Sequence, residues 1–470
     1  MLKIYNTLSR KKEVLKPRKT KKINLFACGP TTYNFSHLGH ARTYICFDVI
    51  AKYLKETGYK VFYLQNITDI DDKIINRAKE KKIKPLVLAR KFEKEYLKDM
   101  KAISVNSVTK YARATEHIKE IISQVKRLLK KGFAYKIKDG IYYDISKFKD
   151  YGKLSRRTAR GAESAVSRID ESKGKRNKGD FCLWKYAKKG EPKWKSIFGF
   201  GRPGWHIEDT AITEKYFGSQ YDIHGGARDL IFPHHEAEIS QMEAISGKKP
   251  MVKYWLHTGF LTVKSQKMAK SLGNFITIRD FLKEHPDDGV RILRFFVLKS
   301  HYRSPINYSE KIIKQSIKDL EKIDEFIEKL KAATGKQSSK LIKDLVSRTQ
   351  KEFEKAMADD FNTPKTIALI FKLINKGNVL LAQNKLSSTD AKNILKFLRK
   401  IDKVFNFIFP KTFKKKKTPI KILELTKKRE KLRIQKKWKE ADELRKEIQR
   451  LGYKIEDTKK GIKFKKIQKY

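Results

Sequence analysis

Apolar positions in the first part of the chain alternate between the spacing of buried strands and the spacing of a helix. The run Ile23–Ala27 is short and apolar, as a strand inside a sheet requires, and KVFYLQNI at 60–67 repeats this pattern. Between them, four apolar residues fall on one helical face: Ile45, Val49, Ile50 and Leu54. A strand, a helix and a second strand predict a βαβ unit with a right-handed connection and a parallel sheet.

The pattern changes near residue 116, where EHIKEIISQVKRLLKKG predicts an amphipathic helix. Asp139-Gly140 between two alternating runs predicts a β-hairpin. Ser155–Lys195 is rich in Arg, Lys, Gly and Ser and favours irregular structure. Short apolar strands return in YDIHGGARDLIF and YWLHTGFLTV. We therefore expect one nucleotide-binding sheet, divided between 1–115 and 201–275 by an insertion at 116–200.

Beyond residue 280 the chain follows the helical period almost throughout, as in EKIIKQSIKDLEKIDEFIEKLKAA. We expect a connecting region at 276–310 and an all-α domain at 311–412. The run FKKKKTPIK marks a linker, and 413–470 is expected to be a small, very basic module with a helix near Trp438–Leu451. The predicted fold class is α/β: a Rossmann-like parallel-sheet domain with an inserted domain, then a helical bundle and a small C-terminal module.

Charge and cysteine content narrow the class of protein. Lys and Arg number 109 against 53 Asp and Glu, a formal net charge of +56 spread along the chain. A polyanionic partner is the first expectation, the alternative being basic solvated faces with no partner. Cys28, Cys46 and Cys182 are too few for a disulfide framework, and the last two are expected to pack in the interior. With no apolar leader or membrane-length apolar run, a cytoplasmic location is expected.

The stretch CGPTTYNFSHLGH, Cys28 to His40, lies between the first predicted strand and the helix after it. A helix that begins at the C-terminal edge of a parallel sheet directs N–H groups and the positive end of its dipole at that edge, where a phosphate can bind. His37 and His40 are spaced i, i+3 and could both donate toward such a group, and Gly39 permits close approach. Taken alone, the two histidines are equally compatible with a polar surface.

A second candidate is QKMAKSLGN, in which Lys267 and Lys270 lie on a short loop after a strand. Paired lysines on such a loop could neutralise the charge that develops on a phosphoryl group in a transition state. In a chain this basic the spacing alone carries little information. The lysine pair becomes informative only in combination with SHLGH, which lies far upstream in the same chain.

These motifs resemble a known family. HLGH is similar to the HIGH signature, and KMAKS to the KMSKS signature, of class I aminoacyl-tRNA synthetases. The stretches CGPTTYNFSHLGHARTY, NITDIDDKII, GRPGWHIED, YDIHGGARDLIFPHHEAEISQ and KMAKSLGNFITIRD look like cysteinyl-tRNA synthetases in particular. The similarity runs from Ile4 to the final helical module. It implies a ligase that activates L-cysteine with ATP, with Mg²⁺, and transfers it to the 3′-terminal ribose of tRNA-Cys, acting as a monomer.

A metal site follows partly from spacing and partly from the resemblance. His234 and Glu238 are i, i+4 in PHHEAEIS, so on a helix they would share a face and could bind one cation. The resemblance implies Zn²⁺ held by Cys28, a second cysteine, His234 and Glu238, with the substrate thiolate as an added ligand. Asp209 stands where the family has that second cysteine. A carboxylate can also ligate zinc, although with fewer thiolates the site is less selective for it; the alternative is that Asp209 only caps a helix.

The resemblance assigns further roles by position. Catalysis falls to His37, His40, Lys267 and Lys270, although Ala269 replaces the first serine of the lysine loop. The residues assigned to ATP binding are His37, Gly39, His40, His206, Gly225, Gly226 and Lys270. The amino-acid pocket falls to Thr68, Trp205, His224 and Asp229. Contact with the anticodon is assigned to Arg429, Trp438, Asp442 and Asp457, and 276–310 is expected to be the region that contacts the tRNA stem. As plain chemistry, the tryptophans and histidines could equally be core or surface.

Two rival functions remain open at this stage. One is a relative that activates cysteine in the same way but joins it to an amino-sugar acceptor; such relatives look shorter and lack the module that 421–470 would supply. The other is a catalytically idle tRNA- or RNA-binding protein, which Asp209 and Ala269 suggest. Exchange of pyrophosphate into ATP with cysteine discriminates the second rival from the ligase.

Overall fold

The structure is a computed structural model and describes residues 1–157, 172–268, 272–335, 340–410, 419–458 and 461–466. It divides into two compact units, residues 1–409 and 410–470. Lys270 and Ala269 of the lysine loop lie outside the described residues. Among the helices that are described, none is long and apolar enough to cross a membrane.

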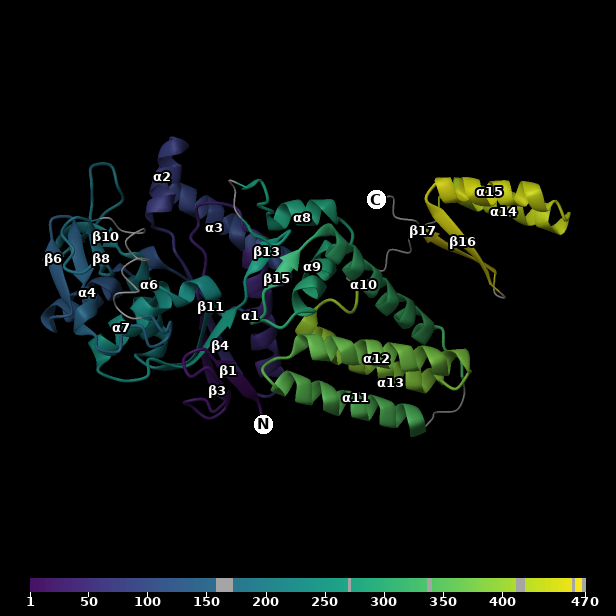
Figure 1. The fold of residues 1–470 in the computed structure, drawn as a ribbon, viewed down its shortest axis with the longest axis horizontal. Coiled ribbons are helices and arrows are strands. Elements are labelled where there is room, and N and C mark those ends of the chain that lie inside the picture. The colour runs from purple at the N-terminus through teal and green to yellow at the C-terminus, as the bar shows by residue number, and fades with distance from the viewer. Residues whose placement is uncertain (158–171, 269–271, 336–339, 411–418, 459–460, 467–470) are drawn as a thin grey trace. The chain divides into compact units, whose positions relative to one another are not determined.

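A five-stranded parallel sheet forms the centre of the larger unit, in the order β12–β11–β3–β4–β5 (Figure 1). Its strands are β3 (Lys22–Ala27), β4 (Lys60–Ile67), β5 (Lys110–Arg113), β11 (Tyr221–Ala227) and β12 (Val252–Thr258). Helix α1 (Leu38–Glu56) connects β3 to β4, which pair in parallel with Leu25 opposite Tyr63. The predicted βαβ unit and the α/β fold class are therefore confirmed.

Alternation along β3 determines which face each side chain occupies. Ile23, Leu25 and Ala27 pack into the core that α1 and the bundle share, whereas Phe26 and Cys28 pack into the core on the opposite face. Helices α6 (Trp205–Phe217) and α7 (His234–Ser246) contribute to that second core. Because side chains alternate across a strand, the residue that follows β3 directs its thiol toward these two helices.

The insertion carries its own antiparallel sheet, in the order β6–β7–β8–β10–β9. Its elements are α4 (Ile118–Lys130), β6 (Ala134–Ile137), β7 (Gly140–Tyr143), β8 (Phe181–Tyr186), β9 (Trp194–Ser196) and β10 (Gly199–Pro203). The predicted hairpin is present, but Ile137 pairs with Gly140, so its two-residue turn is Lys138-Asp139. The expectation of irregular structure was wrong for 181–186 and 194–195, which lie in β8 and β9; Leu183 and Trp184 of β8 are fully buried.

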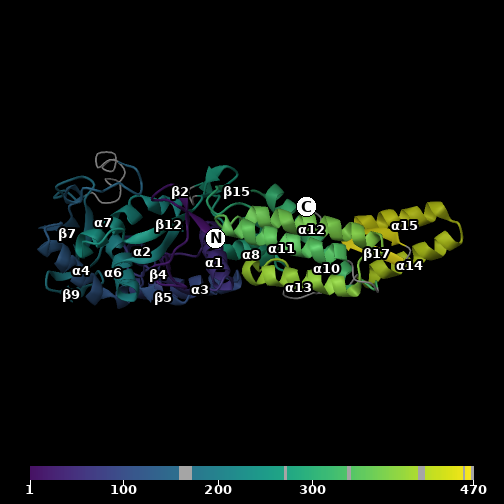
Figure 2. The same ribbon diagram turned by 90° about the horizontal axis from the view of Figure 1, so that it is seen from below.

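Helices extend the larger unit beyond the sheet. The bundle consists of α10 (Glu310–Lys331), α11 (Lys340–Ala358), α12 (Thr363–Ala382) and α13 (Ser388–Phe405), which lie side by side (Figure 2). The remaining elements of this unit are β1 (Lys3–Asn6), β2 (Lys11–Val14), α2 (Asp72–Glu80), α3 (Pro85–Ala102), β13 (Leu261–Val263), β14 (Gln266–Lys267), α8 (Ile278–Glu284), α9 (Gly289–Leu298) and β15 (Ile306–Tyr308). Cys46 is buried as expected, whereas Cys182 is only partly buried.

The smaller unit is a helical pair followed by a β-hairpin. It contains α14 (Ile420–Ile434), α15 (Trp438–Arg450), β16 (Tyr453–Thr458) and β17 (Gly461–Lys466). Its apolar core consists of four buried residues, Ile422, Leu425, Ile448 and Ile455. The helix predicted near Trp438–Leu451 is present as α15.

A buried ion pair joins α1 to α9. The Asp48 carboxylate, with no exposed surface, accepts hydrogen bonds from Arg294 Nη2 and Lys52 Nζ, both at 2.9 Å. Burial alone would raise the pKa of Asp48, but the charges of Arg294 and Lys52 hold it below its ordinary value. The pair therefore stabilises the fold above pH 3.8, and this contribution is lost as the pH falls through the lowered pKa.

Asp48→Asn should lower the free energy of unfolding by about 3 kcal/mol at neutral pH, because it leaves Arg294 as a buried charge without its carboxylate. The difference from the parent should shrink as the pH is lowered, which thermal unfolding followed by circular dichroism at several pH values would measure. A constant difference across that pH range would contradict the assignment.

Candidate active site

Helix α1 begins at the C-terminal edge of the sheet with the two histidines of HLGH. His37 is its N-cap, and its Nδ1 accepts the Gly39 N–H at 3.0 Å; the His37 N–H points to His40 Nδ1 at 3.3 Å. The two rings stack with centroids 3.9 Å apart. Both Nδ1 atoms accept from the backbone, so the neutral form of either ring would carry its proton on Nε2, where it can donate.

Two properties of this helix start suit an anionic ligand. Burial, and secondly the neighbouring His37, lower the pKa of His40 well below its ordinary value, so the ring is neutral near pH 7. A Cβ atom at Gly39 would lie 2.7 Å from His37 Cε1, so this position accepts no larger residue without displacing the ring. The glycine keeps the first turn open for a group that approaches its backbone.

The segment after the lysine loop lies beside the start of α1. The Leu38 N–H donates to the Ile276 carbonyl at 3.1 Å, and Ile278 N–H to the Ser36 carbonyl at 2.9 Å. Lys267 ends the short strand β14. The fold thus brings Met268 and the segment that follows the lysine loop beside HLGH, from which both are distant in the sequence.

A buried group of Cys28, Asp209, His234 and Glu238 follows from the alternation in β3. Asp209 Oδ2 lies 2.8 Å from Cys28 Sγ and 3.2 Å from His234 Nε2, which lies 3.2 Å from Glu238 Oε1. One ligand atom from each residue lies within 4.8 Å of the others. Asp209 lies in the second turn of α6, which begins at Trp205, so the alternative that it only caps this helix is wrong.

This group has the properties of a cation site. Three groups that can carry negative charge, Cys28, Asp209 and Glu238, are at most 5% exposed. Burial and the Asp209 charge raise the pKa of both the Cys28 thiol and the Glu238 carboxyl well above their ordinary values. Among the described residues, Asp209 Oδ1 and both Glu238 oxygens have no hydrogen-bond donor. A divalent cation would neutralise these charges and satisfy these oxygens.

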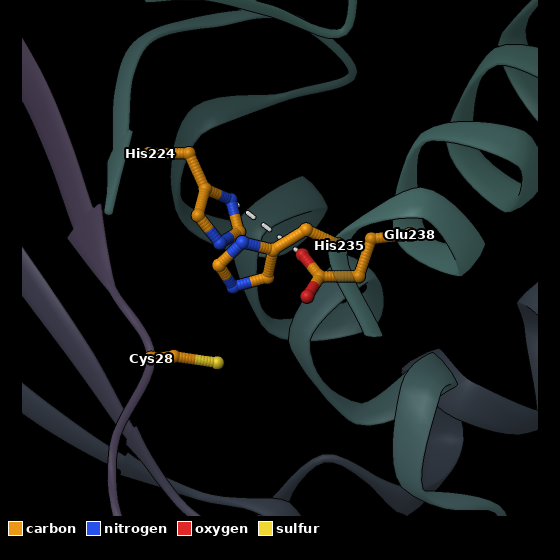
Figure 3. A group of neighbouring side chains, drawn as sticks. All are labelled: Cys28, His224, His235 and Glu238. Atoms are coloured by element: carbon orange, nitrogen blue, oxygen red, sulfur yellow. Dashed lines mark ion pairs between the residues drawn. The ribbon is translucent and has the colours of Figure 1, made fainter. Parts of the chain in front are cut away.

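A second group overlaps the first. Figure 3 shows Cys28, His224, His235 and Glu238 around one space, with Cys28 from the end of β3, His224 from β11, and the other two from α7. His224 Nδ1 lies 2.6 Å from Tyr221 Oη and 3.5 Å from Glu238 Oε2, and His235 Nδ1 lies 2.8 Å from His257 Nε2. These contacts orient both rings, leaving their Nε2 atoms without a hydrogen-bond partner in the described structure.

Most of the other predicted pocket residues surround these groups. The Trp205 ring stacks on His234 with centroids 4.3 Å apart, and His206 Nδ1 lies 2.8 Å from His234 Nδ1. Thr68 Oγ1 donates to Glu208 Oε2 at 2.9 Å, one residue before Asp209. Cβ atoms at Gly225 and Gly226 would lie 2.1 Å from Phe47 Cζ and 2.9 Å from His235 Cε1. Asp229 is exposed instead, in the short turn Arg228–Ile231.

In the smaller unit, two of the predicted anticodon residues contact each other. Arg429 is nearly buried and donates to both oxygens of Asp457, at 3.0 and 2.8 Å. This hydrogen bond and the nearby arginine charges lower the pKa of Asp457 to about 2. Trp438 is 57% exposed at the start of α15, and Asp442 is exposed on the same helix.

Sequence reasoning missed His235, Glu208 and Tyr221 as neighbours of the site. The doubled histidine in PHHEAE was a usable signal, because adjacent helical residues lie about 100° apart and can flank one space from two sides. Glu208 and Tyr221 gave no such signal. Their contacts with Thr68 and His224 depend on the packing of α6 and β11 against neighbouring strands.

Comparison with known families agrees with this geometry. Residues 14–318 match the model described as tRNA synthetases class I (C) catalytic domain, 352–409 the DALR domain, and 421–464 the cysteinyl-tRNA ligase anticodon binding domain. Among solved structures, methionyl-tRNA synthetase from Mycobacterium tuberculosis shares the fold, with TM-score 0.59, 15% identity and 83% and 90% of the two chains covered. A LeuRS from Agrobacterium radiobacter shares the fold with a TM-score of 0.63 and 11% identity, and the match covers 84% of this chain and 85% of that one. The fold and the matched catalytic domain are those of the class I aminoacyl-tRNA synthetases.

Full-length relatives define the family within that class. A cysteine–tRNA ligase from Thermococcus gammatolerans is 44% identical over 99% of both chains, and one from Methanococcus maripaludis is 45% identical over 99% of this chain and 100% of its own. A third, from Carboxydothermus hydrogenoformans, is 42% identical over 99% of this chain and 100% of its own. The chain belongs to the cysteine–tRNA ligase family.

Proposed function

We propose that this chain activates L-cysteine with ATP to cysteinyl-adenylate and pyrophosphate, and transfers the cysteinyl group to the 3′-terminal ribose of tRNA-Cys. The observation that carries this proposal is that the start of α1 and a group of potential metal ligands lie at the same end of the sheet. The start of α1 offers N–H donors to a nucleotide, and the Cys28 group offers ligands to a sulfur-binding cation. The family match over nearly the whole chain supports the same function.

Positioning and charge stabilisation carry the activation step. The cysteine carboxylate attacks the α-phosphate of ATP in line, so charge develops on the phosphoryl oxygens and pyrophosphate leaves. His37 and His40 donate from Nε2 to these oxygens, and Lys267 and Lys270 neutralise the leaving group, with Mg²⁺ accompanying the ATP. His206 and the Gly225-Gly226 pair face the adenosine, as the resemblance implies.

Cys28, Asp209, His234 and Glu238 would hold a zinc ion. When bound, the ion prefers the thiolate of cysteine to the hydroxyl of serine and favours the deprotonated thiol near neutral pH. Trp205 and His206 hold the His234 ring in place, and Thr68, His224 and Asp229 complete the amino-acid pocket. Selection by ligand softness gives the discrimination that an editing domain would otherwise supply.

The smaller unit would bind the anticodon loop. Trp438 offers an exposed ring on which an unpaired base can stack, and Asp442 an exposed carboxylate that can accept from a base edge. Arg429 and Asp457 would contribute as a pair, with Arg429 holding the carboxylate in one orientation. The matched anticodon binding domain at 421–464 supports this role and favours neither rival function.

Purified protein tests the function by exchange of pyrophosphate into ATP with cysteine, measured together with metal content and charging of tRNA-Cys. Cysteine-dependent exchange and charging are expected. Binding of tRNA without exchange would instead support an idle RNA-binding protein, and exchange without charging would support a different acceptor.

Asp209→Cys should keep the metal or bind it more tightly, because a thiolate is a softer zinc ligand than a carboxylate. The matched Asp209→Asn should weaken metal binding by at least the roughly 10–100-fold that loss of an outer hydrogen-bonding partner causes. Metal content after dialysis measures both. If Asp209→Cys loses metal faster than the parent, Asp209 is not a ligand.

A further inference from the structure

The hairpin that leads into the lysine loop turns through two residues with an unusual backbone conformation. Strand β13 pairs with β14 so that Val263 lies opposite Gln266, which leaves Lys264-Ser265 as the turn. Both residues have positive φ, 49° and 64°. A two-residue turn of this kind favours Asn-Gly, and other residues keep such a conformation only where the surrounding structure holds them in it. Because β14 runs directly into the lysine loop, the contacts that hold this turn also set where the loop begins.

Asn307 holds the turn from the neighbouring strand. Strand β15 pairs in parallel with β13, with Asn307 opposite Thr262 (Figure 1). Asn307 Oδ1 accepts the Ser265 N–H at 2.8 Å and the Thr262 hydroxyl at 3.2 Å, and Asn307 Nδ2 donates to Ser265 Oγ at 3.3 Å. The Lys264 N–H donates to the Tyr308 carbonyl at 3.0 Å. One side-chain amide therefore joins the strand and the turn, and β15 contacts both residues of the turn.

The segment that leads into β15 is fixed to the start of α1. Arg42, two residues after His40, is 1% exposed. Its Nη2 donates to three carbonyls of this segment at 2.8, 3.0 and 3.0 Å, those of His301, Tyr302 and Ser304. Hydrogen bonds from a charged donor are stronger than those between neutral groups. The position of β15 is therefore tied to the helix that carries HLGH.

A buried carboxylate from the helical bundle holds the same segment. Asp360, between α11 and α12, has no exposed surface and accepts from Tyr302 Oη at 2.8 Å and from Arg303 Nε at 2.7 Å. His301 Nε2 lies 2.9 Å from the carbonyl oxygen of Asp360. Because α1 and the bundle both hold this segment, β15 is a fixed support on which Asn307 can orient the turn.

The other end of the hairpin lies close to HLGH. Lys267 is the last residue of β14 and pairs with Thr262, and Met268 follows it. A Cβ atom at Gly39 would lie 3.7 Å from Met268 Cε. A change in the turn would therefore move the beginning of the lysine loop relative to the helix start that offers donors to a nucleotide.

We propose that Asn307 is a positioning residue for the activation step: it holds the Lys264-Ser265 turn against β15 and so places Lys267 for the charge that develops on ATP. The proposal rests on the proposed function, in which Lys267 neutralises the leaving group. Asn307 touches neither substrate and acts through the backbone of the hairpin. Its loss should therefore lower the rate of activation and leave the affinity for cysteine unchanged.

Asn307→Ala tests the proposal by steady-state ATP–pyrophosphate exchange. The kcat should fall by roughly 10–100-fold, because a misplacement of about 1 Å can cost 10²-fold, whereas the KM for cysteine should be unchanged. Asn307→Asp keeps an acceptor for the Ser265 N–H and should retain most of the rate. Asn378→Ala is the matched control, an asparagine of α12 whose Oδ1 accepts from Lys329, and should match the parent. Equal losses in Asn307→Ala and Asn307→Asp would overturn the proposal.

A double-variant cycle with Lys267 decides whether Asn307 acts through the lysine loop. If it does, Asn307→Ala should cost less in a Lys267→Ala background than in the parent, because the group that it positions is already absent. Two losses that simply multiply would overturn the proposal. A raised KM for cysteine with an unchanged kcat would also overturn it.

Amide hydrogen–deuterium exchange of residues 261–268 follows the turn without catalysis. Deuterium uptake should be faster in Asn307→Ala, because the Ser265 N–H loses its acceptor, and unchanged in Asn378→Ala. Equal uptake in Asn307→Ala and the parent would overturn the hold on the turn. If the parent shows no cysteine-dependent exchange of pyrophosphate, the proposed function fails, while deuterium uptake still decides whether Asn307 holds the turn.

Discussion

His40→Ala is expected to slow formation of cysteinyl-adenylate by about 10³-fold, the effect of removing one well-placed donor to a developing anion. The structure gives two reasons for so large an effect. His40 is held by the backbone N–H of His37 and by stacking on the His37 ring, so its Nε2 is fixed in direction. Its lowered pKa keeps the ring neutral near pH 7, so Nδ1 can accept the His37 N–H while the proton on Nε2 remains to donate to the ligand.

ATP–pyrophosphate exchange measures this step without tRNA. His40→Asn, which retains a side-chain N–H, should recover part of the rate. His285→Ala, a partly buried histidine after α8, is the control and should match the parent. Binding of tRNA should persist in all three variants because the residues assigned to the anticodon lie in the smaller unit. An unchanged exchange rate in His40→Ala would remove His40 from the catalytic group.

Local pattern predicted the sheet well because its strands obey simple rules. Strands buried on both faces are short and apolar, and the run Ile23–Ala27 matches β3 to within one residue. The insertion was harder, because Leu183 and Trp184 lie among Lys, Gly and Arg, which suggested irregular structure. Long-range antiparallel pairing, such as β8 with β7 and β10, supplies order that the local sequence does not contain.

The candidate site was partly predictable for a related reason. Spacing alone paired His234 with Glu238, since both lie on one face of a helix. Spacing does not place Cys28 beside Asp209, 181 residues away; only the family resemblance grouped the two, and their contact requires the alternation of β3 and the packing of α6 together.

Removal of the metal is expected to reduce the preference for cysteine over serine to what the shape of the pocket alone provides. With no cation, burial and the Asp209 charge raise the pKa of the Cys28 thiol and of the Glu238 carboxyl and so disfavour their charged forms, and the pocket holds no group that favours sulfur. What remains is pocket shape, and a difference of one atom in shape gives only about 10–200-fold discrimination. Cysteine-dependent exchange after chelation, compared with serine-dependent exchange, measures the loss, and added Zn²⁺ should restore the preference.

Variants distinguish the effect of losing the metal ion from nonspecific damage that the chelator causes. His234→Ala and Glu238→Gln should lose both metal and selectivity, because each removes one of four ligands that lie within 4.8 Å of one another. Glu236→Gln is the matched control on the same helix: its carboxylate accepts the Ser155 N–H at 2.8 Å and lies outside the ligand group, so metal and selectivity should persist. A metal-free protein whose preference for cysteine is undiminished would refute selection by ligand softness and assign that role to the shape made by Trp205 and His224.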